Sequence, residues 1–156
     1  MLSDCYLPRL GGIEVQVADL SARLVARGHE VEVFTLTPGG VGYGQIETVN
    51  GIRVHRLGVK LPRQLLINPL ATRGLRDRLS GFDVAHIHMG VVSPFAYDAA
   101  TLVMRMGLPA TMTWHCVLDK AEAAVRAAGL VRRWAQGGMA MNAVSDVAAT
   151  PLRRIV

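Results

Sequence analysis

The amino-acid sequence predicts an α/β fold: a Rossmann-like, doubly wound and mainly parallel sheet with helices on both faces. Two observations predict it. Apolar runs of strand length alternate with amphipathic runs of helix length along the 156 residues. Glycine, or a cap residue followed by proline, marks most boundaries between them. Because strands that alternate with helices pair in parallel through right-handed crossovers, we expect a single layered domain over residues 1–156.

The first expected element is a short strand, and a helix follows it. Only residues 1–5 precede the glycine turn before the helix, so the first strand is expected to be clipped. Over residues 13–27, apolar side chains recur every three or four positions, and Gly28 then ends the helix. Residues 31–36 are expected to form the next strand.

A hairpin and a second helix are expected next. Residues 46–49 and 52–57 flank Asn50-Gly51, which is a strong signal for a two-residue hairpin turn. Asn68-Pro69 has the pattern of an N-cap followed by proline at the first helical position, which predicts a helix as far as Ser80.

The second half of the chain repeats the strand-and-helix rhythm. Ser93-Pro94 and Ser145 are expected to cap helices, and Pro151 is expected to kink or restart the last of them. The expected elements are strands over 83–89, 109–115 and 139–144, and helices over 94–106, over 119–136 as one helix or two, and from 146 onward.

Positive charge is concentrated in one segment. The formal net charge is +5, and residues 53–78 alone carry six arginines and one lysine against a single acid. Such a patch indicates an anionic partner. Arg63, Arg73, Arg76 and Arg78 stand among leucines, so the segment either lies on an anionic membrane or is a solvated face. Nucleic acid is not expected, because the segment has no aromatic residue for base stacking.

Composition also predicts where the protein works. No apolar run reaches the roughly 18 residues that span a bilayer, and the start lacks the features of a secretory signal. We therefore expect a cytoplasmic protein, peripheral on the inner face of the membrane if the basic segment binds lipid. Cys5 and Cys116 predict no disulfide framework. The preference for arginine over lysine hints at a GC-rich bacterial genome.

A glycine turn is the first candidate site, because ligands of open parallel sheets bind at the carboxyl ends of the strands. Gly11 and Gly12 precede a helix whose N-terminal N–H groups attract anions, although a plain tight turn would have the same sequence. The pattern is neither G-x-G-x-x-G nor a P-loop. A nicotinamide enzyme is disfavoured for this reason.

Three histidines are the second candidate site. His86 and His88 alternate along one strand and share a face; they could bind zinc, but no third ligand of suitable spacing is evident, so no metal is expected. His88 is expected to enter the cleft and His86 to be a core residue. His115 ends the next strand, where it either binds or protonates a ligand or is simply structural. Ser145-Asp146 is foremost a helix cap.

Five segments in register resemble the N-terminal, acceptor-side half of a family 4 glycosyltransferase of two-lobed GT-B architecture. These segments are Leu7 to Glu14, Arg27 to Val31, Asp83 to His88, Thr113 to His115 and Ala143 to Asp146. Residues 93–99 also resemble the branch that attaches sugars to phosphatidylinositol-type lipids, which includes the transferase that begins the GPI anchor.

The resemblance implies retaining transfer of a sugar from a nucleotide-diphosphate donor to a hydroxyl acceptor, without a cofactor. It implies that Gly11 and Gly12 lie against the donor diphosphate and that His115 is catalytic, beside the transferred sugar. Tyr6, His88 and Ser93 are expected to contact the acceptor. The partner would be a donor-binding C-terminal lobe, absent from these residues or on another chain, without which the chain is expected to be inactive. The alternative is a non-catalytic Rossmann-like module that binds an anionic lipid or a protein.

Overall fold

A computed structural model describes residues 1–59, 67–118 and 121–156 of the chain. In this part of the chain seven strands form one sheet, in the order β3-β4-β2-β1-β5-β6-β7. The strands are β1 (Leu2–Ser3), β2 (Glu32–Thr35), β3 (Ile46–Val49), β4 (Ile52–Arg56), β5 (Ala85–Met89), β6 (Ala110–Trp114) and β7 (Ala140–Ala143). The helices are α1 (Gly12–Ala26), α2 (Leu75–Leu79), α3 (Pro94–Met106), α4 (Glu122–Ala128), α5 (Leu130–Gln136) and α6 (Asp146–Arg153).

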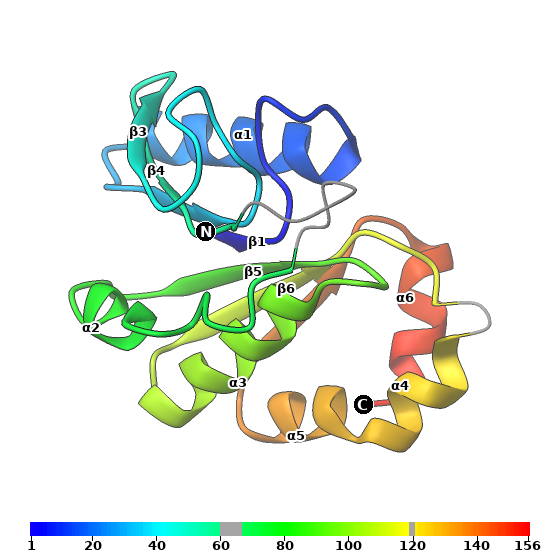
Figure 1. Cartoon of the computed structure of the whole chain (residues 1–156). Helices are drawn as coiled ribbons and strands as arrows, with labels where there is room; N and C mark the ends of the chain where they lie inside the picture. Colours follow the sequence, from blue (N-terminus) through cyan, green and yellow to red (C-terminus); the bar gives the residue numbers. More distant parts are fainter. Residues whose placement is uncertain (60–66, 119–120) are drawn as a thin grey trace.

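The sheet is parallel at every pairing except the β3–β4 hairpin. Asn50 and Gly51 turn that hairpin with φ angles of 51° and 78°, the left-handed pair that the sequence predicts for this turn. Helix α1 lies on one side of the sheet, and α3, α4 and α5 lie on the other (Figure 1). The Rossmann-like α/β fold class is therefore confirmed.

The two-residue strand β1 lies at the centre of the sheet. Leu2 pairs with Phe34 of β2 on one side and with Ile87 of β5 on the other. The chain runs outward from β1 to β2 and β4 and then returns to β5, so the strand order reverses between β1 and β5. In open α/β sheets such a reversal is where ligands bind, outside the carboxyl ends of the strands.

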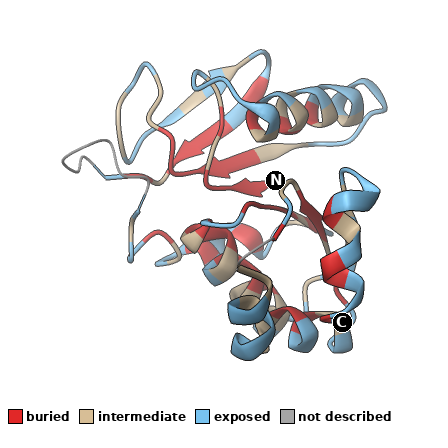
Figure 2. Ribbon diagram, turned by 90° about the vertical axis from the view of Figure 1, so that its right-hand side faces the viewer, coloured by how far each residue is buried: buried red, intermediate tan, exposed pale blue. Residues whose placement is uncertain are grey.

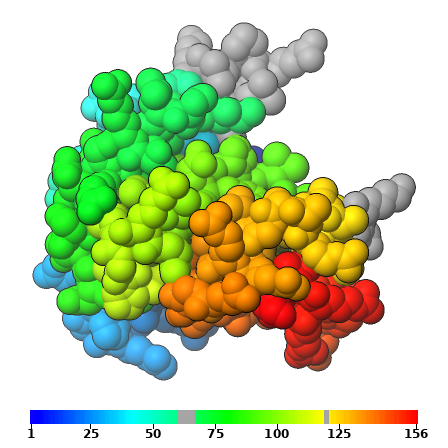
Figure 3. Space-filling model, turned by 90° about the horizontal axis from the view of Figure 1, so that it is seen from below, coloured from blue at the N-terminus to red at the C-terminus, as the bar shows by residue number. Residues whose placement is uncertain are grey.

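Two hydrophobic cores lie on opposite faces of the sheet because neighbouring side chains on a strand alternate. The smaller core, beneath α1, contains Tyr6, Val17, Val33, Ile52 and Val54. The larger core contains residues from β5 and β6 and from α2, α3, α5 and α6. Figure 2 shows the buried residues concentrated in the strands and on the inward sides of the helices. Figure 3 shows α3, α4, α5 and α6 side by side over the larger core.

The second helix is shorter than its sequence predicts. Asn68 does not begin it: the Asn68 side chain accepts a hydrogen bond from the Leu70 N–H at 3.0 Å and donates one to the Leu57 carbonyl at 2.5 Å. A series of turns follows, and Gly74 adopts the left-handed conformation at φ 72°. Helix α2 begins only after it. The prediction of a helix start at residue 68 is wrong because the backbone hydrogen bonds after Asn68 close separate turns between residues three positions apart, and the left-handed Gly74 interrupts the chain before α2.

Other boundaries differ in smaller ways. Gly129, at φ 66°, divides the expected 119–136 helix into α4 and α5. Helix α6 continues through Pro151 without the expected restart, although Ser145 caps it as predicted. Lys60, Arg63 and the expected helix start at Asp119 lie outside the described residues. Within the described ranges, no helix is long and apolar enough to cross a bilayer.

Candidate functional site

The glycine turn begins α1 at the carboxyl edge of the sheet. Gly11 is the N-cap, in an extended conformation, and no side chain caps the first turn. A methyl group placed on Gly11 would lie 2.5 Å from the Glu14 carboxylate, whereas one on Gly12 would meet nothing within 4 Å. The backbone at Gly12 is therefore open to a ligand, while Gly11 leaves room for Glu14.

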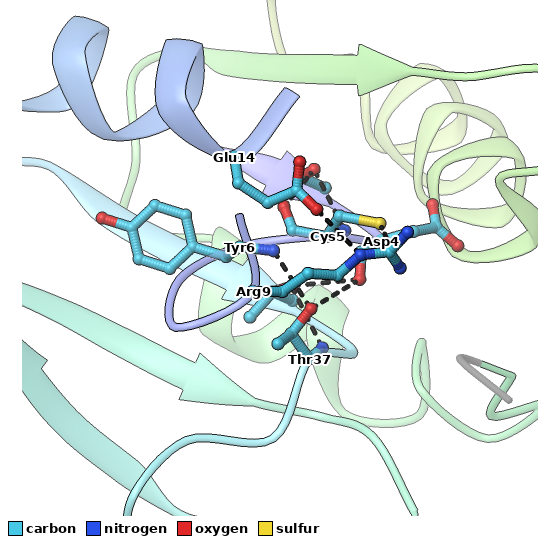
Figure 4. Close-up of polar contacts among 8 residues, drawn as sticks. Asp4, Cys5, Tyr6, Arg9, Glu14 and Thr37 are labelled. Carbon is cyan, nitrogen blue, oxygen red and sulfur yellow. Dashed lines mark hydrogen bonds and ion pairs between the residues drawn. The ribbon is translucent and has the colours of Figure 1, made fainter. Parts of the chain in front are cut away.

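An ion pair, absent from the sequence-based candidates, borders this turn. The Glu14 carboxylate is buried and lies 3.0 Å from Arg9 Nε, while the Arg9 side chain is 56% exposed. Arg9 Nη1 also donates to Cys5 Sγ at 3.4 Å, as Figure 4 shows. Negative charge is favourable near a helix N-terminus, so Glu14 stabilises α1. It also repels an incoming anion, and the exposed guanidinium of Arg9 offsets that repulsion.

Asp4 joins the central strand to α3. Its two carboxylate oxygens accept the N–H groups of Phe95 and Ala96, both at 3.0 Å. Its backbone carbonyl accepts hydrogen bonds from the hydroxyls of Thr35 and Thr37, at 3.2 and 3.5 Å. Burial raises the pKa of Asp4 to about 6, although the two backbone donors oppose that rise. Asp4 thus holds three elements together beneath the candidate site.

The three histidines form a row on the α1 face of the sheet. His86 and His88 stack with ring centroids 4.3 Å apart, and His86 Nε2 lies 2.7 Å from Thr113 Oγ1. His88 Nδ1 lies 3.0 Å from His115 Nε2. Burial lowers the pKa of all three, to about 4 for His86 and about 2 for His88. All three imidazoles are therefore neutral near pH 7.

Packing brings the glycine turn and His115 to the same place. The His115 N–H donates to the Met89 carbonyl at 3.0 Å, which extends the β5–β6 ladder by one residue. A methyl group placed on the neighbouring Gly90 would lie 3.6 Å from Ile13 Cδ1, in the first turn of α1. The first turn of α1, the end of β5 and the end of β6 are therefore contiguous at the point where the strand order reverses.

The three residues expected to contact the acceptor are enclosed in this structure. Tyr6 is fully buried in the smaller core, and His88 is buried in the histidine row. Ser93 Oγ accepts the Gly90 N–H at 2.9 Å and does not cap α3, because Asp4 takes that role. Acceptor contact by these residues stays a prediction, and it would require each of them to become uncovered.

A buried arginine, Arg56, positions the loops at this edge. It donates from Nε to Glu47 Oε1 at 2.7 Å, and from Nη1 to the carbonyls of Leu7 and Thr37 at 2.6 and 3.3 Å. Its guanidinium also lies 5.8 Å from the centre of the Tyr6 ring. The sequence assigns Arg56 to the basic segment, but its charge is paired inside the protein and is not available to an external anion.

The other candidates lie apart from the histidine row. Arg73, Arg76 and Arg78 are exposed on and before α2. Ser145 and Asp146 line a surface pocket of about 490 Å³ beside β7 and α6, one strand beyond β6. In the described part of the chain, no three histidine, cysteine or acidic side chains form a group that could hold a metal ion.

The open glycine turn and the half-buried His115 lie at the switch point of a Rossmann-like sheet, which is where ligands bind in open α/β sheets. The family model of Glycosyltransferase Family 4 matches residues 10–155. The chain therefore belongs to glycosyltransferase family 4. It is 28% identical to a subunit of the human phosphatidylinositol N-acetylglucosaminyltransferase over 133 residues, which cover 78% of this chain and 26% of that protein. The chain thus spans about a quarter of that relative's length. No solved structure matched the chain.

Proposed function

We propose that this chain is the acceptor-side lobe of a retaining glycosyltransferase of GT-B architecture. The enzyme moves a sugar from a nucleotide-diphosphate sugar to a hydroxyl acceptor. The observation that carries the proposal is the contiguity of the first turn of α1, Gly90 and His115 at the switch point. Together with membership of glycosyltransferase family 4, it favours sugar transfer at this edge.

Charge on the departing diphosphate is the main demand of this reaction, and N–H donors meet it. We propose that the donor diphosphate lies against Gly12, where the backbone is open, and that Arg9 turns toward it. His115 lies beside the transferred sugar and donates or accepts a hydrogen bond there. Gly11 acts indirectly, since it leaves room for the Glu14 carboxylate.

A lipid of the phosphatidylinositol type is the acceptor that we propose. The human relative is named for phosphatidylinositol, which supports this choice. Exposed apolar side chains on the loops that follow β1, β5 and β6 also support an apolar acceptor; they are Leu10, Val92 and Val117. Leu70 is 62% exposed and precedes exposed Arg73 and Arg76, a composition suited to an anionic bilayer surface.

Transfer needs a donor-binding lobe, on the same chain or on another. One lobe cannot enclose the donor, orient both substrates and exclude water. We refer to this chain together with such a lobe as the completed enzyme. The chain without the lobe is expected to bind acceptor-containing membranes and to transfer no sugar.

The test is transfer of labelled N-acetylglucosamine from a nucleotide-diphosphate donor to phosphatidylinositol vesicles, with and without His115→Ala. The completed enzyme is expected to form glycolipid, and His115→Ala is expected to reduce the rate about 10²- to 10³-fold, the usual loss when one preorganised donor is removed. His29→Ala is the matched control, because His29 is exposed beyond the end of α1.

Near-normal transfer by His115→Ala would remove His115 from the reaction. Vesicle binding that survives His115→Ala, with no transfer by the completed enzyme, would instead support a non-catalytic lipid-binding module.

A further inference from the structure

The His88–His115 contact has a property that the proposed function leaves open. Only one proton lies between His88 Nδ1 and His115 Nε2, which are 3.0 Å apart. Both rings are neutral near pH 7, because burial lowers the pKa of each. One nitrogen must therefore donate and the other must accept, and two tautomer pairs satisfy the distance.

The other ring nitrogen of His88, Nε2, distinguishes the two tautomer pairs. His88 Nε2 is buried and has no hydrogen-bond partner among the described residues. If His115 donated, His88 would carry its own proton on that enclosed Nε2, as an N–H without an acceptor. If His88 donates, Nε2 carries only a lone pair. An orphaned buried N–H is the rarer and costlier arrangement.

We infer that His88 is a positioning residue that donates from Nδ1 to His115 Nε2 and so fixes His115 as its Nδ1–H tautomer. His86 stacks on His88 and is itself bound to Thr113, so the His88 ring has little freedom to turn away. The contact therefore sets both the orientation of His115 and the position of its proton.

This tautomer limits what His115 can do. Its Nε2 lone pair is taken by His88, and its Nδ1 carries a proton. His115 therefore presents an N–H donor to an oxygen of the substrate and has no lone pair with which to accept a proton. This functional reading rests on the proposed sugar transfer, whereas the tautomer is a property of this chain alone.

The experiment is nitrogen NMR of the chain labelled with ¹⁵N-histidine, near pH 7 and without substrate. Long-range proton–nitrogen spectra report which ring nitrogen carries the proton. We expect His115 to be protonated at Nδ1 and unprotonated at Nε2. A proton on His115 Nε2 would overturn the inference.

Two variants separate positioning from general structural support. In His88→Asn, the side-chain amide can replace the Nδ1–H donor, so His115 is expected to keep its Nδ1–H tautomer. In His88→Leu the donor is lost, and His115 is expected to gain Nε2–H. His29→Gln, on an exposed histidine, is the control that leaves the His115 signals unchanged. An unchanged His115 tautomer in folded His88→Leu would overturn the positioning role. If that variant does not fold, the wild-type spectrum decides, because a proton on His115 Nε2 overturns the inference.

The outcome is independent of whether the chain is a transferase. A correct tautomer with no effect of His115→Ala on transfer would preserve this inference and overturn the proposed role of His115 in transfer. A correct tautomer with no transfer by the completed enzyme would preserve this inference and overturn the proposed function. A proton on His115 Nε2, together with a loss of transfer in His115→Ala, would overturn this inference and leave the proposed function standing. In the completed enzyme, His88→Leu is expected to slow transfer about 10- to 100-fold through misplacement of His115, and His88→Asn to slow it much less.

Discussion

At the residue scale, the side chains that determine the site are joined across long sequence separations. Asp4 bonds to Phe95 and Ala96, which lie 91 and 92 residues later in the chain. Arg56 bonds to Leu7 across 49 residues. Sequence reasoning proposed His115 and Gly12 as candidates, because a strand end and a helix start are local patterns. It missed Asp4 and Arg56, because their partners are defined only by the folded sheet.

The titration of Asp4 yields a prediction about stability. The pKa of an aspartate is near 3.9 in an unfolded chain, and burial raises that of Asp4 to about 6. Between these values the folded chain binds more protons than the unfolded chain. The contribution of Asp4 to the free energy of unfolding therefore falls as pH rises from about 4 to about 6, by at most about 1.4 kcal/mol per pH unit.

Urea unfolding at pH 4, 5, 6 and 7 measures this contribution as the difference between wild type and Asp4→Asn. The amide of the variant cannot ionise, so the advantage of wild type over the variant is expected to shrink between pH 4 and 6 and then to level off. Every other titratable side chain is present in both proteins, so its contribution cancels in the difference. Asp83→Asn, at an exposed site before β5, is the control for removal of one carboxylate. Parallel curves for wild type and Asp4→Asn would show that Asp4 does not titrate in this range.

At the element scale, three helices begin in three different ways. Ser145 caps α6 from the adjacent position, where its hydroxyl accepts the Ala148 N–H at 3.3 Å. Asp4 caps α3 from a distant strand, and α1 has no side-chain cap. Only the first of these follows from local sequence rules. Of these three helices, α1 is the one whose first-turn N–H groups no side chain caps.

Substitution of the two glycines separates their roles. Gly12→Ala meets open space and adds helix propensity, so the fold is expected to stay intact or to gain up to about 1 kcal/mol. Its methyl group fills the place of the ligand, so the KM of the completed enzyme for the donor is expected to rise about tenfold or more. Gly11→Ala pushes against the Glu14 carboxylate and is expected to destabilise the chain. Thermal unfolding and donor KM measure the two effects; an unchanged KM for Gly12→Ala would contradict diphosphate contact at this turn.

At the scale of the whole molecule, alternation of helices and strands predicted the class of fold, which the structure confirms, and the edge of the sheet where the candidate site lies. The polar row of His86, His88 and Thr113 on one face of the sheet could be predicted only in part. Alternation places His86 and His88 together, but their contact with the next strand depends on the β5–β6 register, in which His88 faces Thr113. The external basic surface is also smaller than the sequence indicates, because Arg56 is buried.

The exposed arginines of this surface are expected to bind anionic membranes. Replacement of Arg73, Arg76 and Arg78 by glutamate is expected to abolish sedimentation with vesicles that contain phosphatidylinositol. Arg126, Arg133 and Arg153 are also exposed, so their replacement by glutamate is the control with the same change in net charge. Equal binding by the two triple variants would mean that net charge alone governs association, and binding equal to wild type would mean a solvated face.

The central position of β1 in the sheet also affects when the chain can fold during its synthesis. A ribosome adds about 5 to 20 residues per second. Leu2 of β1 pairs with Ile87 of β5, so several seconds of synthesis separate β1 from this partner strand. During that interval Asp4 has no helix to cap, and one edge of the nascent sheet is unpaired. We therefore expect cooperative folding of this chain to begin only once β5 and the start of α3 have left the ribosome.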